Sequence, residues 1–149
     1  MPTFRVTAEA HQYYLLDEEI ATPYPEDITD SDLARGFKAV PFLVAVYTSS
    51  DGSVEVHVER TDGAPPLDDA AWVRVFECPL QLPSGRLVVA SPSSFLPDCP
   101  RLHVPPGSYR ARVSGRGFGE GAREEYLVSL WPSHDSAATV IKSAKANAG

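Results

Sequence analysis

The chain has 149 residues, of which 43% are hydrophobic and 22% are charged, and its formal net charge is −7. Because nucleic acids are bound through basic surfaces, this charge argues against a nucleic-acid partner. The sequence contains no apolar run of membrane-spanning length and does not start with a basic stretch followed by an apolar one. These features predict one cytoplasmic domain without membrane contact.

Alternating apolar and polar residues predict strands separated by turns along most of the chain. In residues 3–16 the apolar positions change parity partway, which predicts a strand with a bulge or break. The clearest pattern is in 53–60, where Val54, Val56 and Val58 should point inward. The other expected strands occupy residues 39–48, 70–80, 86–91, 101–104, 108–114 and 124–131.

About eight short strands with turn signals between them are typical of an all-β fold, here a single-domain antiparallel β-sandwich. We place the sandwich domain at residues 1–132 and a flexible tail at 133–149, where small and polar residues dominate. One short helical turn is expected in "TDSDLARGF". Asp30 or Ser31 would cap this turn, and Gly36 would end it.

The negative charge is concentrated in residues 17–32, because the rest of the chain carries 13 acidic and 13 basic residues. Repulsion between the carboxylates should keep this segment mobile unless a basic group meets it. The segment could bind a basic partner protein, or Ca²⁺ through Asp27, Asp30 and Asp32, although no EF-hand spacing is present. A solvated surface connection is the alternative. The acidic residues are Asp17, Glu18, Glu19, Glu26, Asp27, Asp30 and Asp32.

Polar residues on the outward face of the 53–60 strand form a second candidate site. Glu55, His57 and Glu59 are two residues apart and share that face. Imidazole and carboxylate groups are ordinary metal ligands, so this row is the alternative metal site. Cross-strand pairing with arginine or lysine is the simpler explanation. We therefore predict no metal and no cofactor.

Other motifs give no coherent catalytic set, so we predict no catalytic residues. The glycines of "SGRGFGEGAR" are followed by a strand pattern, which indicates a hairpin tip and not a phosphate-binding loop. Cys99 and His103 lack a third orienting group, and the adjacent residues of "SHDS" cannot face one another as a triad. Cys78 and Cys99 form no C-x-x-C pair and should be free thiols.

The segment "VPPGSYRARVSGRGFGEGAREEYLVSLWP" resembles the end of a family of small bacterial β-sandwich proteins with the pattern P-P-G-x-Y-R-x-R followed by E-E-Y-L-V-x-L-W-P. The segments "HQYYLLD", "DGSVEVHVE" and "CPLQLPSGRLVV" also look like that family. More distantly, the chain is similar to the competence DNA-entry nuclease inhibitor family. That similarity implies a small acidic β-sandwich protein whose residues 17–32 would meet a basic nuclease, and it supplies no catalytic residues.

Together these observations favour a bacterial, non-catalytic binding module, with an inhibitor-like action on a basic partner protein. The alternative is a β-sandwich protein that binds a small ligand or metal, with or without enzymatic activity, through Glu55, His57, Glu59 or His103. A sandwich also exposes strand edges, so the sequence leaves a homodimer by edge pairing open.

Overall fold

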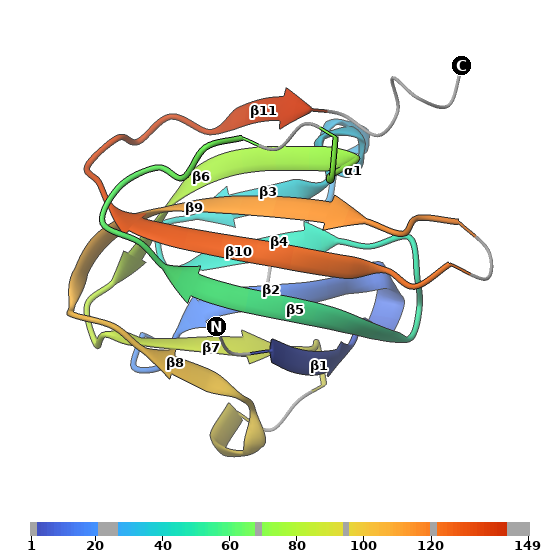
Figure 1. Cartoon of the computed structure of the whole chain (residues 1–149). Helices are drawn as coiled ribbons and strands as arrows, with labels where there is room; N and C mark the ends of the chain where they lie inside the picture. The colour runs from blue at the N-terminus through green and yellow to red at the C-terminus, as the bar shows by residue number, and fades with distance from the viewer. Residues whose placement is uncertain (1–2, 21–26, 68–69, 94–95, 120–121, 143–149) are drawn as a thin grey trace.

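The computed structural model describes residues 3–20, 27–67, 70–93, 96–119 and 122–142, and these form two β-sheets packed face to face (Figure 1). Sheet A is six-stranded. Its order is β1 (Thr3–Thr7), β5 (Ser53–Arg60), β10 (Glu125–Pro132), β9 (Gly107–Arg116), β6 (Arg74–Leu82) and β11 (Thr139–Lys142).

Sheet B is five-stranded, and three short helices lie in the connections. Its order is β3 (Phe37–Val40), β4 (Leu43–Tyr47), β2 (Gln12–Asp17), β7 (Arg86–Ala90) and β8 (Arg101–His103). The helices are η1 (Glu9–His11), α1 (Asp30–Arg35) and η2 (Leu96–Asp98). The predicted all-β sandwich with a short helical turn is confirmed. Neighbouring strands are antiparallel except β5 and β10, which run parallel.

The described residues contain eleven strands instead of about eight, because two expected strands are divided and one was not expected. Residues 3–16 break at η1, where Ala10 and His11 have φ angles of 53° and 59°, so that β1 lies in sheet A and β2 in sheet B. Residues 39–48 divide between β3 and β4 at a turn containing Pro41. The third difference is β11, which pairs with β6 although it lies within the expected tail.

The helical turn ends at Gly36, as predicted, but Thr29 is its N-cap instead of Asp30 or Ser31. Gly36 has a φ of 89°, a left-handed conformation that favours glycine. The Thr29 hydroxyl accepts from the Asp32 N–H, and the Asp32 carboxylate accepts from the Thr29 N–H, both at 3.1 Å. This reciprocal pair is a capping box.

The main core lies between the two sheets and is built from the inward faces of β1 to β10. On β5 the buried residues are Val54, Val56 and Val58, as the alternation predicted. Aromatic contacts join the sheets: the rings of Tyr13 and Tyr126 meet edge to face with centroids 5.3 Å apart. Apolar residues from both layers thus form one continuous hydrophobic core.

Sheet B is buried on its outer face as well. A second apolar cluster there includes Tyr14, Leu16, Tyr47 and Val88, and Ile28 from the segment before α1 packs against it. Strand β4 is consequently buried along its whole length. A strand covered on both faces is apolar at consecutive positions, which explains the unbroken apolar run in the sequence.

A buried carboxylate closes one end of the sandwich. Asp17, the last residue of β2, is fully buried. One of its oxygens accepts from the N–H groups of Glu19 and Ile20 at 2.9 and 3.2 Å, and the other accepts from the N–H and hydroxyl of Ser84 at 2.9 and 2.8 Å. Ser84 lies between β6 and β7, where the chain crosses from sheet A to sheet B. Asp17 therefore ties sheet B to the crossing turn.

A second buried carboxylate, Glu124, lies near the start of β2, at the opposite end of that strand from Asp17. Glu124, directly before β10, is 5% exposed. It accepts from the N–H groups of Ser49 and Ser50 at 3.0 and 2.7 Å and from the hydroxyl of Tyr126. Ser49 and Ser50 lie between β4 and β5, where the chain crosses from sheet B to sheet A. Glu124 thus joins the start of β10 to that crossing.

Replacing Asp17 with alanine should lower the free energy of unfolding by about 2–4 kcal/mol, because four hydrogen bonds to a buried carboxylate are lost. Urea unfolding followed by circular dichroism measures this loss. The matched control is Asp62→Ala, since the Asp62 side chain is fully exposed. We expect the control to change stability by no more than about 0.5 kcal/mol. An equal effect of the two substitutions would contradict the assigned role of Asp17.

Candidate functional site

The structure distributes the acidic residues of 17–32 among different environments. Asp17 is buried, and Asp32 is 6% exposed within the capping box of α1. Arg35 donates to Asp32 at 2.6 Å, and the Lys38 ammonium lies 3.5 Å from the same carboxylate. Asp17 and Asp32 therefore have structural roles, and neither presents its carboxylate at the surface.

The pKa of Asp32 is lowered from 3.8 to about 2. The hydrogen bond from the Thr29 N–H contributes most, and partial burial acts in the opposite direction. Hydrogen bonds from Arg35 and the Thr29 hydroxyl, with the nearby Lys38, lower the pKa further. The ionised carboxylate is therefore the form that stabilises the start of α1.

Glu18 and Glu19 are paired with arginines of this chain. Arg86 contacts both carboxylates, and Arg101 contacts Glu18. The side chains of Glu18 and Glu19 are 23% and 62% exposed, so the pairing extends from a half-buried position to the surface. Basic groups do meet the acidic segment, and here they come from β7 and β8 of the same chain.

Asp27 and Asp30 are exposed, as Glu19 is, and Glu26 lies outside the described residues. Lys38 donates to the backbone carbonyl of Asp27, which holds this part of the chain against β3. Within the described part of the chain, no ion pair forms on the side chain of Asp27 or Asp30. Their charges are therefore directed towards solvent.

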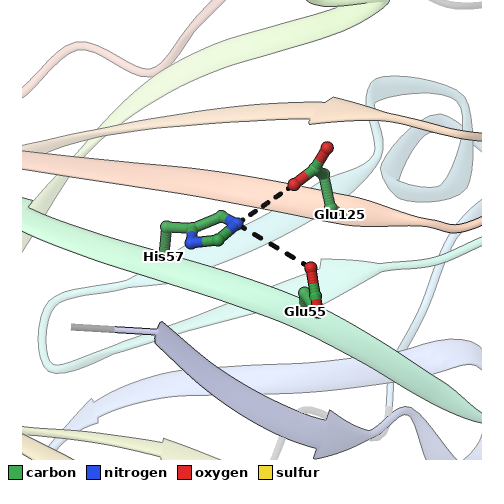
Figure 2. Close-up of side chains that lie close together, drawn as sticks. All are labelled: Glu55, His57 and Glu125. Carbon is green, nitrogen blue, oxygen red and sulfur yellow. Dashed lines mark hydrogen bonds and ion pairs between the residues drawn. The ribbon is translucent and has the colours of Figure 1, made fainter. Parts of the chain in front are cut away.

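The cluster of potential metal ligands in the described residues consists of Glu55, His57 and Glu125. Figure 2 shows the His57 ring directed at both carboxylates, with Glu55 and His57 on β5 and Glu125 on the adjacent β10. His57 Nε2 is 3.0 Å from Glu125 Oε2 and 4.0 Å from Glu55 Oε2. The potential ligand atoms all lie within 4.8 Å of one another.

Neither of the two metal sites considered from the sequence has the expected set of ligands in the structure. Glu59 is outside the cluster and accepts a hydrogen bond from Ser129 at 2.7 Å. Glu125 takes its place because β10 pairs with β5. The possible Ca²⁺ set of Asp27, Asp30 and Asp32 is not brought together in the described structure.

Arginines flank the cluster, as expected for cross-strand pairing. Arg5 of β1 contacts Glu55 at 2.9 Å, and Arg116 of β9 contacts Glu125 at 2.7 Å. Partial burial would raise the pKa of Glu125, but hydrogen bonds from Arg116 and His57 outweigh it, so this pKa is lowered. These hydrogen bonds therefore favour the ionised form of Glu125.

The two cysteines, His103 and the glycine-rich stretch are the remaining candidates from the sequence. Cys78 and Cys99 are thiols not joined by a disulfide, as predicted, and burial raises the pKa of the Cys78 thiol to about 12. His103 is exposed at the end of edge strand β8. Gly117 and Gly119 lie between β9 and β10, so the glycine-rich stretch joins two strands, as predicted. None of the described helices is long and apolar enough to cross a membrane.

Sequence reasoning did not find Glu124 or Glu125. They are adjacent, yet Glu124 is buried among the ends of the sheets and Glu125 lies on the outer face of sheet A. The alternation in "EEYLVSLW" contained the signal for opposite faces. It could not identify β5 as the neighbouring strand, because that pairing joins segments about 70 residues apart in the chain.

No protein-family model matches this chain, and no curated protein sequence matches it. Two solved structures have the same fold. One is the crystal structure of ComJ from Bacillus subtilis, described as an inhibitor of the DNA-degrading activity of NucA. It has a TM-score of 0.74 and 12% sequence identity, and the match covers 89% of this chain and 96% of that chain.

The other structure is described as crocagin biosynthetic gene J. Its TM-score is 0.62, its sequence identity is 18%, and the match again covers 89% of this chain and 96% of that chain. At these identities the two comparisons establish a common fold. The two-sheet arrangement described above is thus shared across nearly the full length of both proteins.

Replacing Asp32 with asparagine should reduce stability at pH 7 by about 1 kcal/mol, because the capping interactions of the carboxylate are weakened. The folded-state pKa lies below the unfolded one, so this contribution is present above about pH 4 and is lost as the pH falls towards 2. Urea unfolding at pH 7 and near pH 2 should show a difference between the two proteins that disappears in acid. Asp30→Asn is the neighbouring control, and a pH-independent difference for Asp32→Asn would contradict this role.

Proposed function

We propose that this chain is a non-catalytic, inhibitor-like binding module that engages a protein partner with a basic surface. The observation that carries the proposal is the fold shared with a nuclease inhibitor along 89% of the chain. Fold alone does not determine function, so the argument also needs a surface suited to such a partner.

The segment around α1 has suitable chemistry. Asp30 and Leu33 are three residues apart and thus share one side of the helix, and Asp27 comes just before the helix. Leu33 is 52% exposed, which is unusual among the large apolar residues of this chain. We call Asp27, Asp30 and Leu33 the α1 patch. An apolar side chain flanked by unpaired charges can provide both contact area and electrostatic complementarity to a partner.

The nature of the partner follows from charge. An enzyme that degrades DNA binds a polyanion, so its substrate surface must be basic. Carboxylates of an inhibitor could occupy that surface in place of phosphates. The support for this step is the fold likeness to an inhibitor of a DNA-degrading enzyme together with the net charge of −7. Such association should be fast and sensitive to salt.

The test compares two variants with the same change in net charge. Asp27→Asn with Asp30→Asn removes the charges of the α1 patch, and Asp62→Asn with Asp98→Asn removes two exposed charges elsewhere. The immobilised wild type and variants are incubated with a native cell lysate at about 0.1 M and about 1 M salt. Between these concentrations the electrostatic screening length falls from about 10 Å to about 3 Å. Captured proteins are identified, and DNA degradation by the lysate is measured with each protein added.

We expect the wild type and the control variant to retain a basic protein at low salt and to slow DNA degradation. In the α1-patch variant, both the capture of the basic protein and the slowing of DNA degradation should be at least tenfold weaker. Leu33→Ser should weaken capture at either salt concentration. Equal capture by the two charge variants would exclude the α1 patch. An unchanged rate of DNA degradation in the presence of wild type would exclude the nuclease as the partner class.

A further inference from the structure

The outer face of sheet A carries a row of four charged residues on four neighbouring strands. Arg5 lies opposite Glu55, Glu55 opposite Glu125, and Glu125 opposite Arg116. Two carboxylates therefore face each other at the centre of the row. Directly opposed like charges destabilise a sheet unless a cation or proton donor lies between them. The group between them here is the ring of His57 (Figure 2).

We propose that Glu55, His57 and Glu125 form a binding site for one divalent transition-metal ion, with Zn²⁺ as the best-fitting ion, which would link β5 to β10. This site lies outside the α1 patch and does not depend on the proposed inhibitor function. One imidazole nitrogen and two carboxylates are common zinc ligands, and three protein ligands leave a fourth position for water. Ca²⁺ fits less well, because it requires six or more oxygen ligands.

The distances match a zinc site with little movement. Zinc bonds of about 2.0–2.2 Å place neighbouring ligand atoms of a tetrahedron roughly 3.4 Å apart. The observed separations from His57 Nε2, 3.0 Å to Glu125 and 4.0 Å to Glu55, lie on either side of that value. The three side chains are 22–32% exposed, so an ion can reach them from solvent while the strands hold their backbones in place.

Thr3 can hold the His57 ring in the form that binds metal. Its Oγ1 lies 2.7 Å from His57 Nδ1. Without metal, Nε2–H donates to the Glu125 carboxylate, and the hydroxyl can donate to Nδ1. With metal on Nε2 in place of that proton, the same hydroxyl can accept from Nδ1–H. A partner on the second ring nitrogen is the usual means of orienting a metal-bound histidine. β1 thus supplies a supporting contact to ligands on the next strand.

The flanking arginines compete with the metal for the carboxylates, but both can move aside. The Arg5 side chain is 64% exposed and the Arg116 side chain is 43% exposed, so their ion pairs contribute little stability. Arg116 also lies over the ring of Trp72, at 4.4 Å from the centroid, and would keep that contact after releasing Glu125. Removing the Arg5 competitor should therefore strengthen metal binding.

The experiment uses the full chain without a histidine tag, freed of metal, and Zn²⁺ alone as the probe. Isothermal titration measures stoichiometry and affinity, and Co²⁺ provides an absorption spectrum that reports the coordination geometry. The variants are His57→Gln, Glu125→Gln and Arg5→Gln. Glu59→Gln is the matched control, because Glu59 shares the outward face of β5 and lies outside the cluster. Circular dichroism establishes that each variant is folded.

We expect one Zn²⁺ per chain and a Co²⁺ spectrum of four-coordinate type. His57→Gln and Glu125→Gln should each weaken binding at least tenfold, Glu59→Gln should leave it within twofold, and Arg5→Gln should strengthen it severalfold. The gain in Arg5→Gln separates a metal site from a purely structural ion-pair row, for which removing Arg5 gives no tighter binding. Absence of stoichiometric binding, or binding unchanged in His57→Gln, would overturn the proposal.

Discussion

The two-sheet fold depends on satisfying backbone N–H groups where the chain crosses from one sheet to the other. At such a crossing the chain leaves one ladder before it joins the next, so its donors need acceptors from elsewhere. Asp17 and Glu124 provide them near opposite ends of β2. A carboxylate suits this role, because its two oxygens can accept several hydrogen bonds at once. These acids are therefore part of the fold's internal framework.

The two sheets differ in what their outer faces can do. The outer face of sheet B carries a buried apolar cluster, and Ile28, from the segment before α1, packs against it. Sheet A instead exposes a polar face built from ordered strands, including Glu55, His57 and Glu125. A flat protein–protein contact suits the first surface, and a site of fixed geometry suits the second. The α1 patch and the Glu55–His57–Glu125 cluster share no residue and no strand, so the two can be occupied independently.

Local pattern was enough to predict the sandwich, since alternation in β5 and the parity change before β2 are properties of consecutive residues. It missed β11, whose residues are exposed or half-buried and so leave little apolar signature. It substituted Glu59 for Glu125, because strand order and the parallel β5–β10 pairing are non-local. It also treated Asp17 and Asp32 as surface charges, because composition counts a carboxylate without its hydrogen-bond donors.

This last difference changes how the acidity of the chain should be interpreted. Arg86, Arg101, Arg35 and Lys38 neutralise much of the 17–32 segment from within the fold. Long-range attraction still depends on the net charge of −7, which all acidic residues share. Short-range recognition depends only on groups free to contact a partner, such as Asp27 and Asp30. Steering and specificity are therefore separable here: the whole chain can attract a basic partner, while only a small exposed surface can select one.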